Sequence, residues 1–272
     1  MTRHIWTIAS VSFAALALAA CGGEEPADTA AAPAETAAPA AVAPPDYAAA
    51  VASPDRLATD RERDTARKPA EVLAFSKIMT GNTVFEMEAG GGYYTEMISR
   101  AVGPTGQVIM QGPKEFVQFY KADMDAHLAD NRLANVRVSE SPFDTLDAPD
   151  ASVDVVTWFQ GPHEMYCKAA CGNAPLGDTA KAYQEIARIL KPGGYLVIMD
   201  HVAAQGAPET TGNDLHRVDP LIVKAAATTA GFTLDEESSI LANPSDDHTK
   251  GVFDDSIRGK TDQFLLRYKK PG

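Results

Sequence analysis

Three consecutive glycines, Gly90–Gly92, join two segments of different periodicity. The apolar segment Thr83–Met87 before them has the length of a buried strand, and apolar residues with helical spacing begin near Tyr93. Glycine lets the backbone approach a ligand closely, and a helix N-terminus presents free N–H groups. Glycines also serve tight turns that bind nothing. The strand before and the helix after favour a loop that receives the polar part of a nucleotide-like ligand.

Two histidines follow predicted strands further along the chain. His163 comes shortly after the apolar run Val153–Phe159, and His201 comes shortly after the strand Tyr195–Met199. Because the carboxyl ends of parallel strands meet at one edge of a sheet, both histidines are expected over the same cleft. His163 is the first candidate for a catalytic base or an acceptor-orienting group, and His201 is the second. A loop histidine bonded only to backbone is the alternative.

Acidic neighbours widen the chemistry that these histidines could perform. Glu164 follows His163, and Asp200 precedes His201. Two imidazoles with a carboxylate are ligands that transition metals accept, so a metal site is an open alternative. The favoured interpretation assigns no metal and gives the chemistry to the histidines themselves.

A third polar cluster begins at Asp214, which is predicted to cap a helix. His216 and Arg217 follow it, and they are expected either to line an acceptor pocket or to form the solvated first turn of that helix. Further on, the loop from Asn243 to Lys260 is longer than a plain turn requires. Its length and charges fit a lid over the pocket and a surface excursion equally well.

The N-terminal segment 1–20 has the layout of a secretory signal: a short basic start, then an apolar stretch too short to span a bilayer comfortably. The run Leu18–Cys21 resembles the lipobox of bacterial lipoproteins. This resemblance implies cleavage before Cys21, a lipid on that cysteine and anchoring at the periplasmic face of a membrane. Gly22 after the cysteine points to the outer membrane rather than the inner one. An ordinary cleaved signal with Cys21 incidental is the alternative.

Composition divides the remainder into a linker and one domain. Residues 21–52 consist mostly of Ala, Pro, Glu and Thr, which cannot bury enough apolar surface to offset the entropy of ordering, so they are predicted to be a disordered tether. Residues 53–272 suit a single domain with one core. The chain has a formal net charge of -13, which would repel a phosphate backbone, so nucleic acid is excluded as a partner.

The chain contains three cysteines. If Cys21 carries lipid, Cys167 and Cys171 remain as a pair in a compartment that permits disulfides. A disulfide between them is therefore expected, with two free thiols as the alternative. It would stiffen the loop that carries His163.

The predicted elements alternate between strands and helices. This order predicts a doubly wound, Rossmann-like α/β fold with a mostly parallel seven-stranded sheet and helices on both faces. The last two strands follow each other with no helix between them, so the last strand is expected to be antiparallel. Residues Asp60–Ile78 are predicted to form one helix ahead of the first strand.

These features together resemble the class I S-adenosylmethionine-dependent methyltransferases over residues 60–270. The resemblance rests on the strand and glycine loop at 83–92, the strand ending at Gln111, Asp144 before the run Val153–Phe159, and the sequence Leu190–Tyr195 leading into a strand. More narrowly, Ala66–Pro69, Gly90–Glu96, Asp200–His201 and Arg258–Asp262 look like a subgroup of predicted exported bacterial methyltransferases.

The resemblance implies S-adenosylmethionine as the cofactor and assigns residues to its parts. Residues of the glycine loop would line the amino-acid and sulfonium end: Glu86, Glu88, Ala89, Gly90, Gly91 and Gly92. Gln111 would hold the ribose, and Phe143 with Asp144 would lie beside the adenine. Gln111 replaces an acidic residue and Glu88 replaces a glycine of the family pattern.

The predicted function is methyl transfer from S-adenosylmethionine to a small-molecule acceptor. Positioning supplies much of the catalysis in such a displacement, and a base is needed only when the acceptor carries a proton. The competing hypothesis is a non-catalytic ligand-binding lipoprotein that keeps the fold. The departures at Gln111 and Glu88 favour it, and the intact glycines oppose it.

Overall fold

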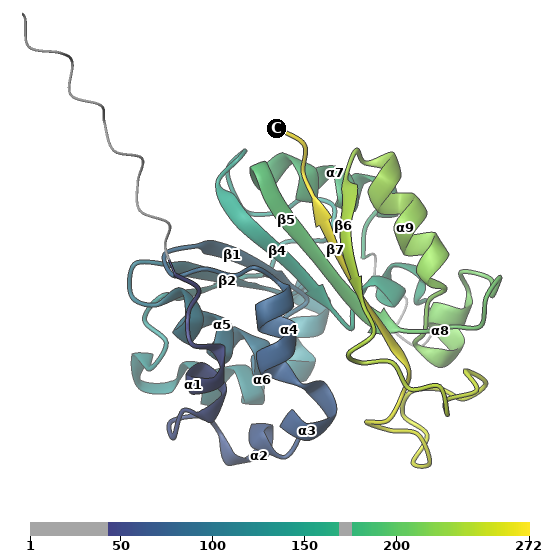
Figure 1. The fold of residues 1–272 in the computed structure, drawn as a ribbon, viewed down its shortest axis with the longest axis horizontal. Helices are drawn as coiled ribbons and strands as arrows, with labels where there is room; N and C mark the ends of the chain where they lie inside the picture. Colours follow the sequence, from purple (N-terminus) through teal and green to yellow (C-terminus); the bar gives the residue numbers. More distant parts are fainter. Residues whose placement is uncertain (1–42, 169–175) are drawn as a thin grey trace, which may run out of the picture. The chain divides into compact units, whose positions relative to one another are not determined.

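The computed structural model describes residues 43–168 and 176–272 and contains one seven-stranded sheet in strand order β3-β2-β1-β4-β5-β7-β6 (Figure 1). The chain divides into two units, Met1–Ala40 and Ala41–Gly272, and the sheet belongs to the second. The strands are β1 (Thr83–Met87), β2 (Gln107–Gln111), β3 (Val136–Ser139), β4 (Val153–Phe159), β5 (Leu190–His201), β6 (Thr233–Ser238) and β7 (Gln263–Lys269). Strand β7 is antiparallel to both of its neighbours and the other pairings are parallel, which confirms the predicted fold class.

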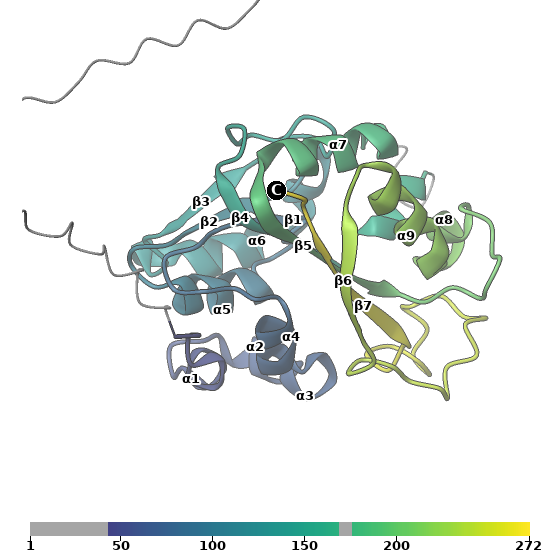
Figure 2. The same ribbon diagram turned by 45° about the horizontal axis from the view of Figure 1, so that its top comes forward.

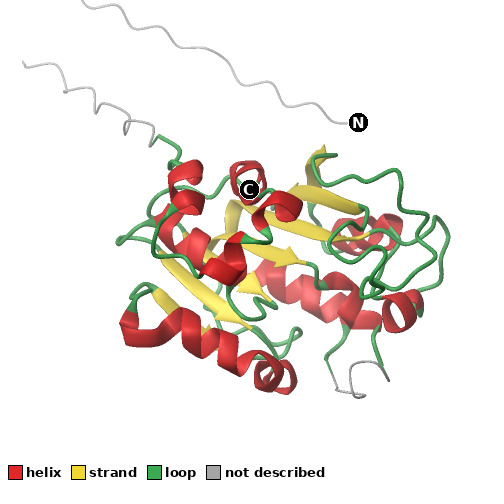
Figure 3. Ribbon diagram, turned by 90° about the horizontal axis from the view of Figure 1, so that it is seen from below, coloured by secondary structure: helices red, strands yellow, loops and turns green. Residues whose placement is uncertain are grey.

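Helices lie on both faces of the sheet (Figures 2 and 3). The α-helices are α1 (Tyr47–Ala52), α2 (Ala58–Arg61), α3 (Asp64–Arg67), α4 (Pro69–Phe75), α5 (Tyr93–Val102), α6 (Lys114–Leu128), α7 (Thr179–Ile189), α8 (Thr211–Leu215) and α9 (Pro220–Thr229), and the 3-10 helices are η1 (Ala129–Asn131) and η2 (Pro162–Tyr166). In β1, Val84 belongs to an apolar cluster with residues of α4 and α5, whereas Phe85 belongs to a second cluster that includes residues of α7 and α9. This alternation follows from the two-residue period of a strand buried on both faces.

The strand order reverses between β1 and β4, because β2 pairs with one side of β1 and β4 with the other. In open α/β sheets, ligands bind outside the carboxyl ends of the strands at such a reversal. The register places Met87 opposite Trp158, so the glycine loop after β1 and the segment after β4 leave the sheet side by side.

The segment ahead of β1 is not one helix, as predicted, but three short ones. Lys68 takes a left-handed conformation (φ 43°) immediately before Pro69, which occupies the first turn of α4. Proline disfavours helical geometry in the residue before it, and this breaks the helix. The break turns the side chains of α2 and α3 toward the glycine loop.

The folded unit also begins earlier than predicted. Helix α1 lies within the segment assigned to the tether, Asp46 caps it through the backbone N–H of Ala49, and the Tyr47 hydroxyl donates to the Ile78 carbonyl at 2.6 Å. The boundary at residue 52 is therefore wrong, because local composition does not report contacts with distant helices.

The segment 1–20 and Cys21 lie outside the described residues. No helix in the described parts of the chain is long and apolar enough to cross a membrane.

The long connection between β6 and β7 is fastened to the domain by a buried ion pair. Arg217 is 0% exposed and donates to both carboxylate oxygens of Asp246, at 2.9 and 3.1 Å. It also donates to the Lys250 carbonyl. Arg217 is thus neither a pocket residue nor a solvated one. The cap of the following helix is Asp219 rather than Asp214.

Candidate active site

The glycine loop is held against the end of β2 by two hydrogen bonds. The backbone N–H of Ala89 donates to the Gln111 carbonyl at 2.8 Å, and the N–H of Glu88 donates to Gln111 Oε1 at 2.9 Å. Gly90 (φ 58°) and Gly92 (φ 111°) take left-handed conformations that glycine adopts without strain. Gly92 also stands at the N-terminus of α5 with no side-chain cap, so the first turn of that helix faces the loop.

A cavity of about 390 Å³ opens beside this loop. Its polar walls come from three places: the end of β1, the helices ahead of β1, and α6. The lining residues are Leu57, Thr59, Asp60, Arg63, Arg67, Glu86, Met87, Glu88, Ala89, Gly90, Gly91, Tyr93, Tyr94, Tyr120, Asp123, His127, Phe159 and Gln160. The volume falls in the range of small-ligand sites. The structure therefore brings Glu86, Glu88 and the predicted loop residues Ala89, Gly90 and Gly91 into one site.

Glu86 contributes a buried carboxylate to the cavity. Thr95 Oγ1 donates to Glu86 Oε2 at 2.6 Å, and within the described chain no other hydrogen bond reaches this carboxylate. Burial raises the pKa of Glu86 to about 8. A cation bound in the cavity would favour the ionised form and supply the missing partner. Glu86 is thus suited to an ammonium or sulfonium group.

Arg67 faces the same cavity and is the residue whose role sequence reasoning missed. Its guanidinium lies 4.5 Å from the centre of the Tyr93 ring, and Arg63 lies 4.8 Å from it. Arg63 is paired with Asp60, whereas Arg67 makes no side-chain hydrogen bond or ion pair with any residue in 43–168 or 176–272. Burial lowers the pKa of Arg67, as expected for a cation without a counterion. A ligand carboxylate would provide one.

His127 of α6 braces the back of the glycine loop as a charged group. Its Nδ1 faces the Asp123 carbonyl at 2.8 Å and its Nε2 faces Asp60 Oδ2 at 2.7 Å. The Asp123 carbonyl and the ionised Asp60 carboxylate can only accept hydrogen bonds. Both ring nitrogens of His127 must therefore carry protons. Burial lowers the pKa of His127 and raises that of Asp60. Their mutual hydrogen bond outweighs burial only together with further contacts, the Asp123 carbonyl for His127 and Arg63 for Asp60. The pKa of His127 is raised and that of Asp60 is lowered.

We expect His127→Gln to reduce the free energy of unfolding by about 1–3 kcal/mol near pH 6, because a charge-assisted hydrogen bond is lost. A group whose pKa is raised on folding stabilises below its unfolded value of 6.5 and loses this contribution as pH rises through its folded value. The difference between wild type and variant should therefore shrink above that pH. The other charged and titratable groups that face the imidazole, Asp60, Arg63, Glu86 and Glu96, are present in both proteins. Urea unfolding from pH 5 to pH 9 measures this difference; a constant difference would contradict the prediction.

The ribose assignment requires a free amide at Gln111. In the structure, both ends of this side chain are already hydrogen-bonded. Its Oε1 accepts from Glu88 and its Nε2 donates to the Ser141 carbonyl at 2.7 Å, so the side chain braces the loop. The space beside it is only about 10 Å³, because Phe116, Tyr120 and Met124 of α6 fill it.

Phe143 and Asp144 also lie away from the cavity. Phe143 is fully buried and packs against Trp158, with ring centres 5.5 Å apart. Asp144 accepts from the backbone N–H of Asp178 at 3.1 Å, ahead of α7. Neither residue lines the glycine-loop cavity, and their assignment to the adenine stays a prediction.

The two predicted catalytic histidines lie near each other, with ring centres 6.2 Å apart, but in different environments. His163 Nδ1 lies 2.8 Å from Asp200 Oδ1, and the His163 backbone N–H donates to Asp200 Oδ2. Burial lowers the pKa of His163, but Asp200 and then Glu164 outweigh it and raise the pKa to about 10. Burial lowers the pKa of His201 well below its usual range, and its Nδ1 lies 2.7 Å from Thr261 Oγ1.

His216 lies beside His163. The sequence left open whether His216 would line an acceptor pocket or form a solvated turn. Its Nδ1 lies 3.3 Å from His163 Nε2, and Glu164 Oε1 lies 3.3 Å from the same nitrogen. This group is adjacent to the glycine loop, since Glu88 Oε2 occupies the space where a side chain on Gly161 would start. Glu88 therefore lies between the glycine-loop cavity and the segment that carries His163. Burial, and secondly the charge of Glu164, raise its pKa well above the usual range.

Cys167 lies at the end of η2, close after this cluster, and is buried. Its predicted partner Cys171 lies outside the described residues. The pairing therefore stays a prediction.

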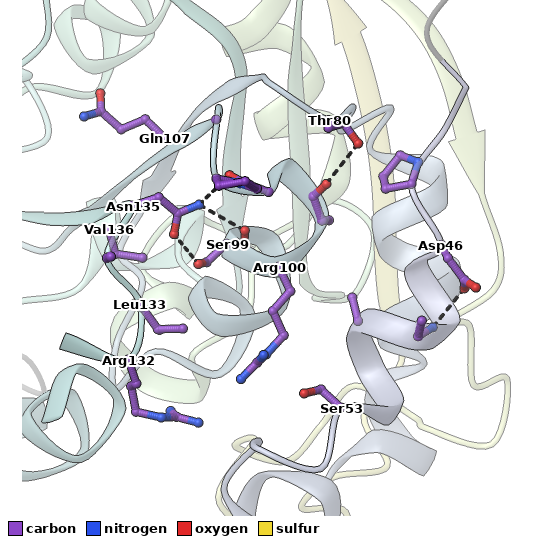
Figure 4. Close-up of a pocket in the computed structure, with 18 of the residues that line it drawn as sticks. Asp46, Ser53, Thr80, Ser99, Arg100, Gln107, Arg132, Leu133, Asn135 and Val136 are labelled. Atoms are coloured by element: carbon purple, nitrogen blue, oxygen red, sulfur yellow. Dashed lines mark hydrogen bonds between the residues drawn. The ribbon is translucent and has the colours of Figure 1, made fainter. Parts of the chain in front are cut away.

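A second cavity, of about 990 Å³, lies at the opposite edge of the sheet (Figure 4). It is bounded by α1, the end of α5 and the amino ends of β2 and β3. Its polar side chains bond to one another: the Asn135 amide donates to the carbonyls of Ser99 and Gly103, and both Arg100 and Arg132 pair with Glu96. This cavity is larger than the one beside the glycine loop. It lies at the amino ends of the strands, whereas α/β proteins bind ligands at the carboxyl ends.

Comparison with known proteins gives concordant matches. A family model described as a methyltransferase domain matches residues 80–241, more than half of the chain. The ubiquinone/menaquinone biosynthesis C-methyltransferase UbiE of Saccharophagus degradans is 28% identical over 185 residues, which are 67% of this chain and 69% of the relative. The corresponding protein of Marinomonas sp. is 26% identical over 67% of this chain and 68% of the relative. The crystal structure of an S-adenosylmethionine-dependent methyltransferase from Aquifex aeolicus shares the fold, with a TM-score of 0.53, 21% identity, and coverage of 76% of this chain and 97% of that chain.

Proposed function

The chain belongs to the methyltransferase domain family and is an S-adenosylmethionine-dependent methyltransferase, and from this premise we propose that it methylates a small molecule bound between the glycine-loop cavity and the histidines after β4 and β5. S-adenosylmethionine supplies a methyl group on a sulfonium that any suitably placed nucleophile can take. The protein's contribution is to place the two partners and to exclude water.

The observation that carries this proposal is the pairing of opposite charges in one cavity of about 390 Å³. Glu86 offers a carboxylate with one hydrogen-bond donor, and Arg67 offers a guanidinium with no counterion among the residues described. Together they fit the ammonium and carboxylate of an amino acid, which is the polar end of S-adenosylmethionine. Burial of Glu88 beside them suits a neighbouring cationic sulfonium.

The acceptor side is proposed to lie across Glu88, at the cluster of His163, Glu164 and His216. Asp200 holds the His163 ring through Nδ1 and fixes its orientation. In this arrangement His163 orients the acceptor, and His201 is the second group able to move a proton. The curated relatives are named as C-methyltransferases of ubiquinone and menaquinone biosynthesis, and these names support a small-molecule acceptor. The net charge of -13 supports the same class of acceptor over a nucleic acid.

We also propose that the enzyme is lipid-anchored through Cys21 at the periplasmic face of a bacterial membrane, with the outer membrane favoured over the inner one. The support is the sequence Leu18–Cys21 and the apolar segment before it. Cys167 and Cys171 are proposed to pair in that compartment.

Calorimetry of the full chain with S-adenosylmethionine and S-adenosylhomocysteine tests the proposed cofactor site. Wild type is expected to bind both, and Gly90→Val is expected to abolish binding, because a β-branched residue is strained at φ 58° and projects beside Tyr120. Binding to neither ligand, or binding that the valine leaves unchanged, would reject the methyltransferase site and favour the non-catalytic alternative. Thermal unfolding of the variant verifies that it is folded.

A further inference from the structure

Three potential metal ligands from two separate elements converge at the acceptor side. His163 and Glu164 belong to η2, and His216 ends α8. Their ligand atoms form a nearly regular triangle: His163 Nε2 lies 3.3 Å from Glu164 Oε1 and 3.3 Å from His216 Nδ1, and His216 Nδ1 lies 3.6 Å from Glu164 Oε1.

These separations match one coordination geometry better than another. Around Zn²⁺ with bonds of about 2.0–2.1 Å, neighbouring ligands of a tetrahedron lie about 3.3–3.4 Å apart, whereas neighbouring ligands of an octahedron lie about 2.9 Å apart. The observed triangle has the edges of a tetrahedron. Two imidazoles and a carboxylate are also the ligand types of catalytic zinc sites, which leave the fourth position open.

Metal-binding histidines commonly donate their other ring nitrogen to a carboxylate, and Asp200 is placed to accept from His163 in this way. It lies 2.8 Å from His163 Nδ1 and accepts the His163 backbone N–H, so Nε2 is the ring nitrogen that points at the triangle. Asp200 itself is completely buried. The position of His163 is therefore fixed before any ligand arrives.

Packing between η2 and α8 holds the triangle together. Gly212 of α8 lies so close to η2 that a side chain there would start 2.4 Å from the His163 carbonyl oxygen. Phe253, from the β6–β7 connection, covers the outer side of His216 with ring centres 4.9 Å apart. The side chains of Glu164 and His216 keep 14% and 17% of their surface exposed, which leaves an entry path.

A second group of this kind, Asp60, Glu96 and His127, lacks these properties. His127 Nε2 is already in direct hydrogen-bond contact with Asp60, and Glu96 is paired with Arg100 and Arg132. Arginines neutralise that group, so it is an ion-pair network. Among the described residues, no arginine or lysine pairs with His163 or His216.

We propose that His163, Glu164 and His216 bind one Zn²⁺ ion, or a similar divalent transition metal, with an open position toward the acceptor side of Glu88. The ion would act as a Lewis acid for an oxygen of the acceptor. The site stands on its own geometry and does not depend on S-adenosylmethionine binding. The alternative is that His163, Glu164 and His216 share a proton and bind no metal. The experiment must distinguish these two arrangements.

The experiment titrates the tag-free, full-length chain, freed of metal by a chelator, with Zn²⁺ alone in a calorimeter and with Co²⁺ in a spectrophotometer. Wild type is expected to bind one equivalent of Zn²⁺ and to give the strong visible absorption of four-coordinate Co²⁺. Glu164→Gln and His216→Ala should each weaken Zn²⁺ binding at least about 100-fold. Asp200→Asn should weaken it about 10- to 100-fold, since it removes the charge that orients the His163 ring and no metal ligand.

His248→Ala is the matched control, because His248 contacts Asp262 and lies outside the cluster. This variant should bind Zn²⁺ as wild type does. Thermal unfolding of each variant establishes that it is folded. No stoichiometric binding to wild type, or equal affinity in wild type, Glu164→Gln and His216→Ala, would overturn the metal site and leave the shared proton. Titration with S-adenosylmethionine is scored separately, so the cofactor site and the metal site succeed or fail independently.

Discussion

Replacing Arg67 by glutamine is expected to raise the dissociation constant for S-adenosylmethionine about 10- to 100-fold. The guanidinium lies in the glycine-loop cavity with the Tyr93 ring as its contact and with no counterion in the described chain. Hydrogen bonds to charged groups contribute about 1.5–3 kcal/mol, and about 1.4 kcal/mol corresponds to a tenfold change. Arg67→Lys keeps the charge but loses the planar fork, so it should fall between wild type and Arg67→Gln. Calorimetry measures all three.

Arg137→Gln serves as the control, since Arg137 pairs with Asp147 near the protein surface away from the cavity. It should bind S-adenosylmethionine like wild type. Glutamine at position 67 also removes a cation–π contact, worth about 0.5–1 kcal/mol of stability, so unfolding curves are needed for each protein. If Arg67→Gln is folded and keeps the affinity of wild type, Arg67 does not bind the ligand carboxylate.

Replacing Arg217 by methionine is expected to lower the free energy of unfolding by about 3–5 kcal/mol, because it leaves the buried carboxylate of Asp246 without its cation. Asp246 also accepts the backbone N–H groups of His248 and Asp262, so one carboxylate joins the middle of the β6–β7 connection to its end next to β7. For a domain of this size the melting temperature should fall by about 10 °C. Differential scanning calorimetry measures the change.

Lys121→Met is the control for this second prediction. Lys121 and Asp125 form an ion pair one helical turn apart with side chains 68% and 64% exposed, and such pairs contribute about 0–1 kcal/mol. Equal losses in Arg217→Met and Lys121→Met would mean that the buried pair is not what fastens the connection. The double variant Arg217→Met with Asp246→Asn should recover part of the loss, since it removes the unpaired charge and keeps a side-chain oxygen as an acceptor for backbone N–H groups.

The fold was predictable because it depends on local patterns. The run Val153–Phe159 and the glycines after Met87 signal a strand and a strand–helix turn without reference to any partner. The errors lie where distant contacts decide. The tether was predicted to reach residue 52 because alanine-rich composition hides α1, whose Tyr47 bonds to Ile78 far along the chain. The single helix before β1 failed at Lys68, although Pro69 was a visible signal.

The site was predictable only in part, for the same reason. Strand ends placed Glu86, the glycines and both histidines at one edge of the sheet. Pairings between side chains followed no sequence pattern: Gln111 bonds to the loop instead of facing it, and Asp144 turns toward α7. Arg67 was visible only as part of a family-like sequence. Its lack of an acidic partner becomes informative once the cavity is known.

Helix α6 has a kinetic consequence for the enzyme. Phe116, Tyr120 and Met124 leave about 10 Å³ beside Gln111, while the amino-acid end of the site is already open. A nucleoside that takes the predicted place beside Gln111 would have to displace these side chains before it is seated. We therefore expect association to occur in two steps, a rapid capture and a slower rearrangement whose rate levels off at high ligand concentration. An amino acid alone should bind in the rapid step only.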